Sequence, residues 1–415
     1  MKEVFQHEHS WNDWDWENIC NRSMKKLLGK YERKIISQGL ADAGNITLLG
    51  LDAEVSSNRP MAEVATELVK VFDHMNISSL LYAEPAEPYR SILAYFGDRQ
   101  ETCLMPTDCE TRTFLHDIPV IPSLTAAAVS RALSARKAAI VGNRGIVSSG
   151  TVSPEQAFVS FSSVCFSIFV KFFSDVMFHL EDRRADKVPE NRDLMSAYTR
   201  IAGMISLPSR PCDEIPASPP QYEQEVYQQL ILTGRQLVER KLVDSYFGNI
   251  SYIFRDTMYI SQTGSSLDEL DTCIDAVPLD GSSSSGITAS SELSAHISVY
   301  KKTGRRAIVH GHPKFTVIMS MSCRKEGCDL STCYRSCREQ RAVSGMPIVS
   351  GEIGTGPTGL VTTVPEAMES SQAVIVFGHG IFSASDDTFR PAFELMQSTE
   401  YSCMKEYFKK IQGLI

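Results

Sequence analysis

An α/β fold arranged as two domains is predicted by three features of the sequence. Stretches with helical periodicity recur together with short apolar runs that are typical of buried strands. The chain has 415 residues, which is more than one typical hydrophobic core accommodates. Several segments of the first half also return in the second half in the same order, which indicates two copies of one fold.

Residues 1–17 are predicted to be a separate arm. They are acidic and polar and carry all three tryptophans, Trp11, Trp14 and Trp16, which could dock on the body or form a surface for another subunit. The arm lacks the apolar segment of a secretory signal. No run approaches the roughly twenty apolar residues that a membrane span needs. We therefore expect a cytoplasmic protein without a membrane segment.

Residues 18–205 are expected to form the first domain, which opens with an amphipathic helix over 18–40. One face of that helix is apolar and carries Leu27, Leu28, Tyr31, Ile35 and Ile36. Residues 206–220 contain five prolines and no periodicity, which predicts an extended linker. The second domain then covers 221–415 and begins with another helix.

Two turns flank a predicted strand over 250–260 in the second domain. Gly248 and Asn249 precede this strand, and Thr263 and Gly264 lie in the polar segment that follows it. Such segments can offer backbone N–H groups and hydroxyls to a phosphate. Ordinary hairpin turns would have the same composition.

Two apolar runs of the second domain end in histidines. Ala307–Val309 is predicted to be a buried strand that ends in His310 and His312, and Ala373–Phe377 a strand that ends in His379. Because side chains alternate along a strand, His310 and His312 point the same way. Three imidazoles are the usual protein ligands of a catalytic zinc with an open position, although strand-end histidines without a metal would show the same pattern.

A carboxylate precedes these histidines. Ser290 and Ser291 open a polar step before Glu292, and Glu292 and His296 lie four residues apart, on one face of a predicted helix. Burial beside a metal position would raise the pKa of Glu292 and suit it to acid/base work. His296 is more typical of a packed histidine.

The repeat predicts different roles for the two halves. The matching segments are Leu40–Thr47 with Leu242–Ser251, Arg90–Gly97 with Arg306–Pro313, and Ala139–Ile146 with Ile375–Ile381. In this alignment Ala94, Phe96 and Arg144 occupy the three histidine positions. We therefore expect the first copy to be degenerate, without metal ligands, and to have a structural or interface role.

Residues 223–415 resemble the class II aldolase/adducin family of metal-dependent sugar-phosphate aldolases, epimerases and dehydratases. The motifs that carry the resemblance occur in family order: Gly248-Asn249, Thr263-Gly264, Ser290-Ser291-Glu292, His310-Gly311-His312 and His379-Gly380. The resemblance implies tandem three-layer α/β/α domains with mostly antiparallel central sheets. It also implies a phosphate-binding group made of Gly248, Asn249, Thr263, Gly264, Ser290 and Ser291.

The resemblance implies a metal-dependent lyase that cleaves a carbon–carbon bond of a phosphorylated ketose. Zinc or another divalent ion on His310, His312 and His379 would stabilise an enediolate, and Glu292 would move the proton. An epimerase or dehydratase of sugar phosphates needs the same groups. A non-catalytic scaffold of the adducin type and a sugar-phosphate sensor are further alternatives, but a scaffold has no reason to retain these four residues.

The formal net charge of −9 argues against nucleic-acid binding. The composition, with 43% hydrophobic and 22% charged residues, is that of a soluble globular protein. Most of the eleven cysteines are expected to be reduced. Four of them form a cluster that could bind a second metal or an iron–sulfur group, or could be thiols of an inserted loop: Cys323, Cys328, Cys333 and Cys337.

Family members commonly form fourfold rings with sites at subunit borders, where a neighbouring subunit often supplies an aromatic acid/base. The resemblance therefore implies a homo-oligomer. With two copies in one chain, a dimer would be a pseudo-tetramer in which the degenerate copy lines a border of the active copy.

Overall fold

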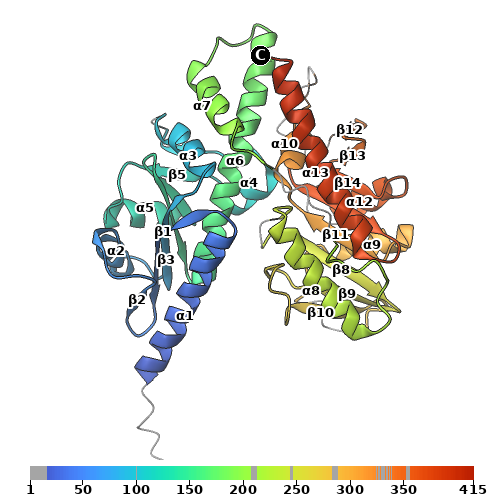
Figure 1. Cartoon of the computed structure of the whole chain (residues 1–415), viewed down its shortest axis with the longest axis horizontal. Coiled ribbons are helices and arrows are strands. Elements are labelled where there is room, and N and C mark those ends of the chain that lie inside the picture. The colour runs from blue at the N-terminus through green and yellow to red at the C-terminus, as the bar shows by residue number, and fades with distance from the viewer. Residues whose placement is uncertain are drawn as a thin grey trace, which may run out of the picture.

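The computed structural model shows two sheets side by side in one molecule (Figure 1). We call residues 16–206 the first half and residues 213–415 the second half. The structure describes residues 16–415 except 100, 207–212, 244–245, 283–287, 324, 326–327, 329–331, 333–334, 336, 338 and 352–355. The predicted arm before Trp16 and the start of the predicted linker therefore lie outside the described residues.

The first half holds a seven-stranded sheet in the order β2-β1-β3-β7-β6-β5-β4. Its strands are β1 (Ala41–Leu51), β2 (Val55–Ser57), β3 (Ser79–Pro85), β4 (Cys103–Leu104), β5 (Ile118–Ile121), β6 (Ala138–Val141) and β7 (Gly145–Gly150). Its helices are α1 (Trp16–Ser37), α2 (Glu63–Val69) with the short helix η2 (Lys70–Asp73), α3 (Tyr89–Gly97), α4 (Cys109–Leu115), α5 (Ala126–Ala135), α6 (Pro154–Arg184) and α7 (Arg192–Ala202).

The second half holds an eight-stranded sheet in the order β10-β9-β8-β11-β15-β14-β13-β12. Its strands are β8 (Asn249–Phe254), β9 (Thr257–Ser261), β10 (Ile274–Pro278), β11 (Ala307–Gly311), β12 (Arg341–Val343), β13 (Met346–Val349), β14 (Ala373–Val376) and β15 (Gly380–Ser385). Its helices are α8 (Glu223–Glu239), α9 (Leu293–Thr303), α10 (Lys314–Ser320), α12 (Leu360–Met368) and α13 (Phe389–Gln412).

Each half is a three-layer α/β/α unit. In the first half α1 and α6 cover one face of the sheet, while α2 and α5 cover the other. In the second half α8, α10 and α13 cover one face, while α9 and α12 cover the other. Most strand pairs are antiparallel, and the parallel pairs are β5 with β6 and β13 with β14. The predicted fold class is therefore confirmed.

The two sheets share one topology. Apart from the extra edge strand β10, every strand of one sheet has a counterpart at the same position in the other, with the same relative direction. A tandem duplication predicts this agreement. The duplication itself stays a prediction.

The predicted alignment of Arg90–Gly97 with the His-x-His strand is wrong. Residues 89–97 form helix α3, whose buried positions recur at helical spacing, whereas the counterpart of β11 in the sheet is β3. The pairings of β3 with β7 and of β11 with β15 place Tyr82 at the position of His310. Glu84 then takes the position of His312.

Arg144 remains the counterpart of His379, because Gly145 and Gly380 begin equivalent strands. Arg144 Nη2 lies 3.2 Å from Glu84 Oε1. In the first half, an ion pair between the exposed Arg144 and the partly buried Glu84 therefore occupies the position where two of the histidines meet in the second half. The expectation that the first half lacks the histidine set holds, but two of the substituting residues differ from those predicted.

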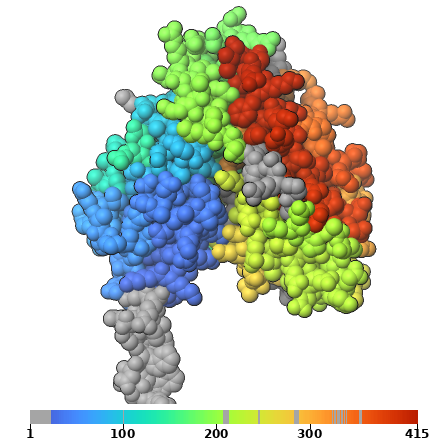
Figure 2. Space-filling view, in the orientation of Figure 1, coloured from blue at the N-terminus to red at the C-terminus, as the bar shows by residue number. Residues whose placement is uncertain are grey.

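A shared core joins the two halves at α6, α10 and α13. Phe173 of α6 packs against Phe315 of α10 and Tyr407 of α13, with ring centroids 5.5 and 5.6 Å apart. The Tyr407 hydroxyl donates to the Phe173 carbonyl at 2.8 Å. Figure 2 shows the two halves meeting along a seam below these helices.

Helix α6 is long and apolar enough to cross a membrane by length and composition, contrary to the expectation that no run approaches such a span. However, 89% of its apolar window is buried inside the structure. Core helices of soluble proteins pass the same test, and the described contacts of α6 are those of such a helix.

Candidate metal centre

Three histidines meet at the end of β11. His310 lies on β11, His312 follows it, and His379 lies in the turn between β14 and β15. One ring nitrogen of each falls within 4.8 Å of the others, and all three side chains are buried. The Nε2 atoms of His310 and His312 are 2.9 Å apart. The predicted metal ligands are thus brought together.

Neighbouring groups orient two of the rings. His310 Nδ1 lies 3.0 Å from the Ile381 carbonyl, which can only accept, so Nδ1 carries the proton and Nε2 keeps its lone pair. The ring of Phe382 stacks on His310 at a centroid distance of 4.0 Å. Phe247 stacks on His312 at 5.7 Å. Such support by second-layer groups is typical of metal-ligating histidines.

Burial keeps these imidazoles neutral. It lowers the pKa of His310 to about 3 and that of His379 to about 4, and the pKa of His312 lies well below its usual value. Neutral rings offer lone pairs to a cation at physiological pH. The donor set therefore fits a divalent ion such as zinc.

Glu292 lies directly before α9 and is buried beside the histidines. Its Oε2 is 3.4 Å from His310 Nε2, and its Oε1 is 3.7 Å from His379 Nε2. Asn249 donates its amide to Glu292 Oε2 at 2.8 Å. Burial raises the pKa of Glu292, and the opposing effects of His379 and Asn249 are smaller.

The predicted phosphate-binding residues gather beside Glu292. Gly248 has φ of +85° and approaches β11 so closely that a Cβ would lie 2.4 Å from the His310 carbonyl oxygen. The amides of Thr263 and Ser290 donate to Thr288 and Ser261 within the protein. Anion binding here would therefore depend on hydroxyl groups and on other amides of these turns.

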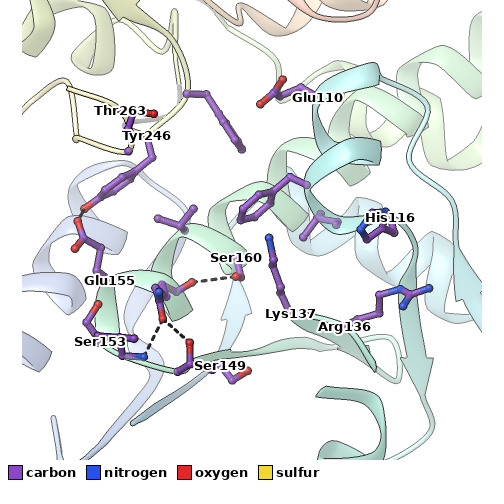
Figure 3. Close-up of a pocket in the computed structure, with 18 of the residues that line it drawn as sticks. Glu110, His116, Arg136, Lys137, Ser149, Ser153, Glu155, Ser160, Tyr246 and Thr263 are labelled. Atoms are coloured by element: carbon purple, nitrogen blue, oxygen red, sulfur yellow. Dashed lines mark hydrogen bonds between the residues drawn. The ribbon is translucent and has the colours of Figure 1, made fainter. Parts of the chain in front are cut away.

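One cavity of about 1320 Å³ contains all ten predicted site residues. They are Gly248, Asn249, Thr263, Gly264, Ser290, Ser291, Glu292, His310, His312 and His379. The first half forms the facing wall, and Figure 3 shows Glu110, Lys137, Ser149, Ser153 and Glu155 lining it. The site thus lies between the halves.

Sequence reasoning missed the residues that the first half contributes. Glu110 Oε2 lies 3.5 Å from His379 Nε2. Burial and the charge of Glu292 raise the pKa of Glu110 to about 7. Glu155 accepts a hydrogen bond from the Tyr246 hydroxyl across the seam. No motif marks Glu110 or Glu155, because their role arises from packing between segments far apart in the chain.

His296 behaves as the predicted packed histidine. It is fully buried, and its Nδ1 lies 2.6 Å from the Ser251 hydroxyl oxygen. Burial lowers its pKa to about 3. It is absent from the cavity lining.

The cysteine cluster gains no support as a metal site. Cys323, Cys328 and Cys337 carry free thiols, and Cys333 lies outside the described residues. Among the residues that the structure describes, the three histidines are the only group whose ligand atoms lie close enough to share an ion.

Residues 228–407 match the sequence model of the family described as Class II Aldolase and Adducin N-terminal domain. The C-terminal part of this chain therefore matches the class II aldolase/adducin family. The match begins inside α8 and ends inside α13, so it includes the three histidines, Glu292 and the turns predicted to bind phosphate. No match was found among curated protein sequences.

Solved structures of class II aldolases resemble the chain in part. An L-fuculose-1-phosphate aldolase from Thermus thermophilus is 22% identical, covers 46% of this chain and 97% of its own, and has a TM-score of 0.38. Another structure described as L-fuculose 1-phosphate aldolase is 25% identical over 45% and 87% of the two chains, with a TM-score of 0.36. A sugar-phosphate aldolase from Thermotoga maritima is 15% identical over 46% and 96%, with a TM-score of 0.34.

Proposed function

We propose that this protein is a metal-dependent lyase that cleaves a carbon–carbon bond of a phosphorylated ketose or a related sugar phosphate. The observation that carries the proposal is the convergence of three buried histidines, a buried carboxylate and the phosphate-binding turns in one cavity. Residues 228–407 match the model of the class II aldolase and adducin family, which supports a sugar-phosphate reaction without fixing which one.

His310, His312 and His379 would hold the metal ion. A divalent ion such as zinc supplies Lewis acidity to the carbonyl and hydroxyl oxygens of a substrate. The neutral rings and the hydrogen bond from His310 Nδ1 to the Ile381 carbonyl suit this role.

Glu292 would carry the proton. In retro-aldol cleavage a hydroxyl loses its proton, the adjacent carbon–carbon bond breaks, and its electron pair passes to the neighbouring carbonyl. A proton must then be returned to the carbon. Glu292 is buried within 4 Å of two histidines and is fixed by Asn249, which suits a group that exchanges protons next to the reacting atoms.

The turns at Gly248-Asn249, Thr263-Gly264 and Ser290-Ser291 would bind the phosphate. They border the same cavity as Glu292. A phosphate held there would direct the carbon chain of the substrate across the histidines. Binding at a distance from the reacting atoms provides the orientation that such a reaction needs.

The experiment is product analysis of the zinc-loaded protein with a panel of ketose phosphates and aldehyde-trapping reagents. Cleavage to an aldehyde and a three-carbon fragment supports the lyase. Isomeric sugar phosphates without cleavage would support an epimerase, and loss of water would support a dehydratase. Absence of every product from the panel would contradict the proposal.

We further propose that the working unit is a cytoplasmic homodimer in which four halves form a pseudo-tetramer. The shared topology of the two halves suits such an arrangement. Small-angle scattering and sedimentation should then report twice the mass of one chain. A monomer at micromolar concentration would contradict this.

A further inference from the structure

Helix α4 of the first half docks on the turn that carries His379. The Cys109 amide donates to the Gly378 carbonyl at 2.7 Å, and the Cys109 thiol lies 3.5 Å from the Phe377 carbonyl oxygen. Gly378 has φ of +61°, and a Cβ there would lie 3.0 Å from the Cys109 sulfur. The first turn of α4 is therefore held against the metal centre by main-chain contact.

This docking places Glu110 in the cavity. Two carboxylates approach the same His379 nitrogen from different halves, Glu110 at 3.5 Å and Glu292 at 3.7 Å. About a fifth of the Glu110 side chain is exposed (21%). Its carboxylate can therefore be reached from the cavity (Figure 3).

Glu110 has few polar contacts within the protein. In the part of the chain that the structure describes, the contact with His379 is the one polar interaction found for its carboxylate. A carboxylate can accept about four hydrogen bonds. The Glu110 oxygens are not among the buried side-chain atoms that lack a partner, so they face the cavity with acceptor positions open to a ligand.

Capping of helix α4 does not account for the position of Glu110, because another residue provides the cap. Asp108 caps the helix, since its Oδ1 accepts from the Thr111 amide at 2.7 Å and its Oδ2 accepts from the Thr111 hydroxyl at 2.5 Å. The Asp108 carboxylate therefore finds its hydrogen-bond donors within one helical turn. Glu110, two residues later, points into the cavity instead (Figure 3).

We propose that Glu110 binds the substrate directly and accepts hydrogen bonds from hydroxyl groups of its polyol chain. This inference rests on the proposed function, because it takes a sugar phosphate as the ligand. Hydroxyl groups are the donors that the Glu110 carboxylate lacks. The two carboxylates, Glu110 and Glu292, would repel a second phosphate group of the substrate. The site therefore selects substrates that carry one phosphate at the turns and hydroxyl groups at the opposite end. The half without the histidines thereby helps to determine specificity.

The test uses two unreactive probes on the zinc-loaded full chain: ribitol 5-phosphate and inorganic phosphate, both measured by calorimetry. Loss of one hydrogen bond to a charged group corresponds to about 10- to 100-fold weaker binding. Glu110→Ala should weaken ribitol 5-phosphate binding by this factor and leave phosphate binding unchanged. Glu110→Gln keeps the side-chain shape and should show a smaller loss. Zinc content and melting temperature should match those of the wild type.

Glu101→Gln provides the matched control. Glu101 is an exposed residue of the same half, paired with Arg99, so its substitution changes the net charge equally without touching the cavity. It should bind both probes as the wild type does.

Three results would overturn the inference. Unchanged ribitol 5-phosphate affinity in both Glu110 variants would show that Glu110 does not contact the polyol chain. Loss of zinc from Glu110→Gln would make Glu110 a metal ligand instead. If the wild type itself binds neither probe, the sugar-phosphate function fails and this inference fails with it.

Discussion

At the scale of single residues, the buried carboxylates differ in what surrounds them. Glu292 is held by Asn249 and lies between two histidines. Asp108 is fully buried but forms a helix cap. Glu110 has an open side toward the cavity. These surroundings, more than the residue type, predict the effect of substituting each one.

Glu292→Gln should abolish turnover while leaving the zinc content intact. Glutamine keeps the shape and the contact with Asn249 but cannot exchange a proton, and loss of a general acid/base costs about 10²- to 10⁴-fold in rate. Steady-state kinetics and metal analysis of the purified variant provide the measurement. Loss of zinc would instead mean that Glu292 is chiefly a ligand.

Asp108→Asn should stabilise the protein at neutral pH. Burial raises the folded pKa of Asp108 from 3.8 to about 6, so its stabilising contribution is complete below about pH 4 and is lost as the pH rises through about 6. Asparagine caps helices about as well and stays neutral. We expect a gain of roughly 1–3 kcal/mol in the free energy of unfolding above pH 7.

Urea unfolding at pH 4 and pH 7.5 measures this effect. Most of the gain should vanish at pH 4, where Asp108 is protonated in the folded state and partly protonated in the unfolded state. An equal change at the two pH values would show that charge burial is not its cause.

At the scale of elements, the site depends on close approach of the turns to β11. Gly248 and Gly264 both have positive φ, of +85° and +69°. A Cβ at Gly248 would lie 2.4 Å from the His310 carbonyl oxygen, whereas a Cβ at Gly264 would meet nothing within 4 Å. The two turns look alike in sequence, and only one is packed against β11, the strand that carries His310.

Gly248→Ala should therefore be far more damaging than Gly264→Ala. The conformational strain alone costs about 1–2 kcal/mol at either position. Gly248→Ala must also shift β8 or β11, so we expect a loss of more than about 3 kcal/mol together with weaker zinc binding. Urea unfolding and zinc titration of both variants measure this. Similar losses in the pair would contradict the packing argument.

At the scale of the whole molecule, the two halves form one structural unit with the site between them. Phe173, Phe315 and Tyr407 pack across the boundary, and Lys34 of α1 pairs with Asp268 of the second half at 2.8 Å. The cavity has walls from both halves. The half without the histidines is therefore part of the site.

Phe173→Ala should destabilise both halves together. Phe173 is fully buried, and removing such a ring costs about 3–5 kcal/mol. Because the core is shared, calorimetry should show a single transition at lower temperature in the variant, with zinc release at that same temperature. Separate transitions for the two halves would show that the boundary contributes little to stability.

Local patterns of the amino-acid sequence predict an α/β fold, the absence of the histidine set from the first half, and Glu292 with the three histidines as a candidate site. The resemblance to the class II aldolase/adducin family adds the six predicted phosphate-binding residues, and all ten residues line one cavity. The local patterns are strand periodicity, glycine turns, and polar residues at the ends of strands. The same reasoning misaligned Arg90–Gly97, because a short apolar segment can be helix or strand until its packing is known.

The contribution of the first half to the site became visible only in the folded molecule. The ion pair of Glu84 with Arg144 follows from strand pairing. The approach of Glu110 to His379 joins residues 269 positions apart in the chain, through the docking of α4 on Gly378. No spacing rule connects such residues, since the contact depends on how the two sheets and their helices pack against each other.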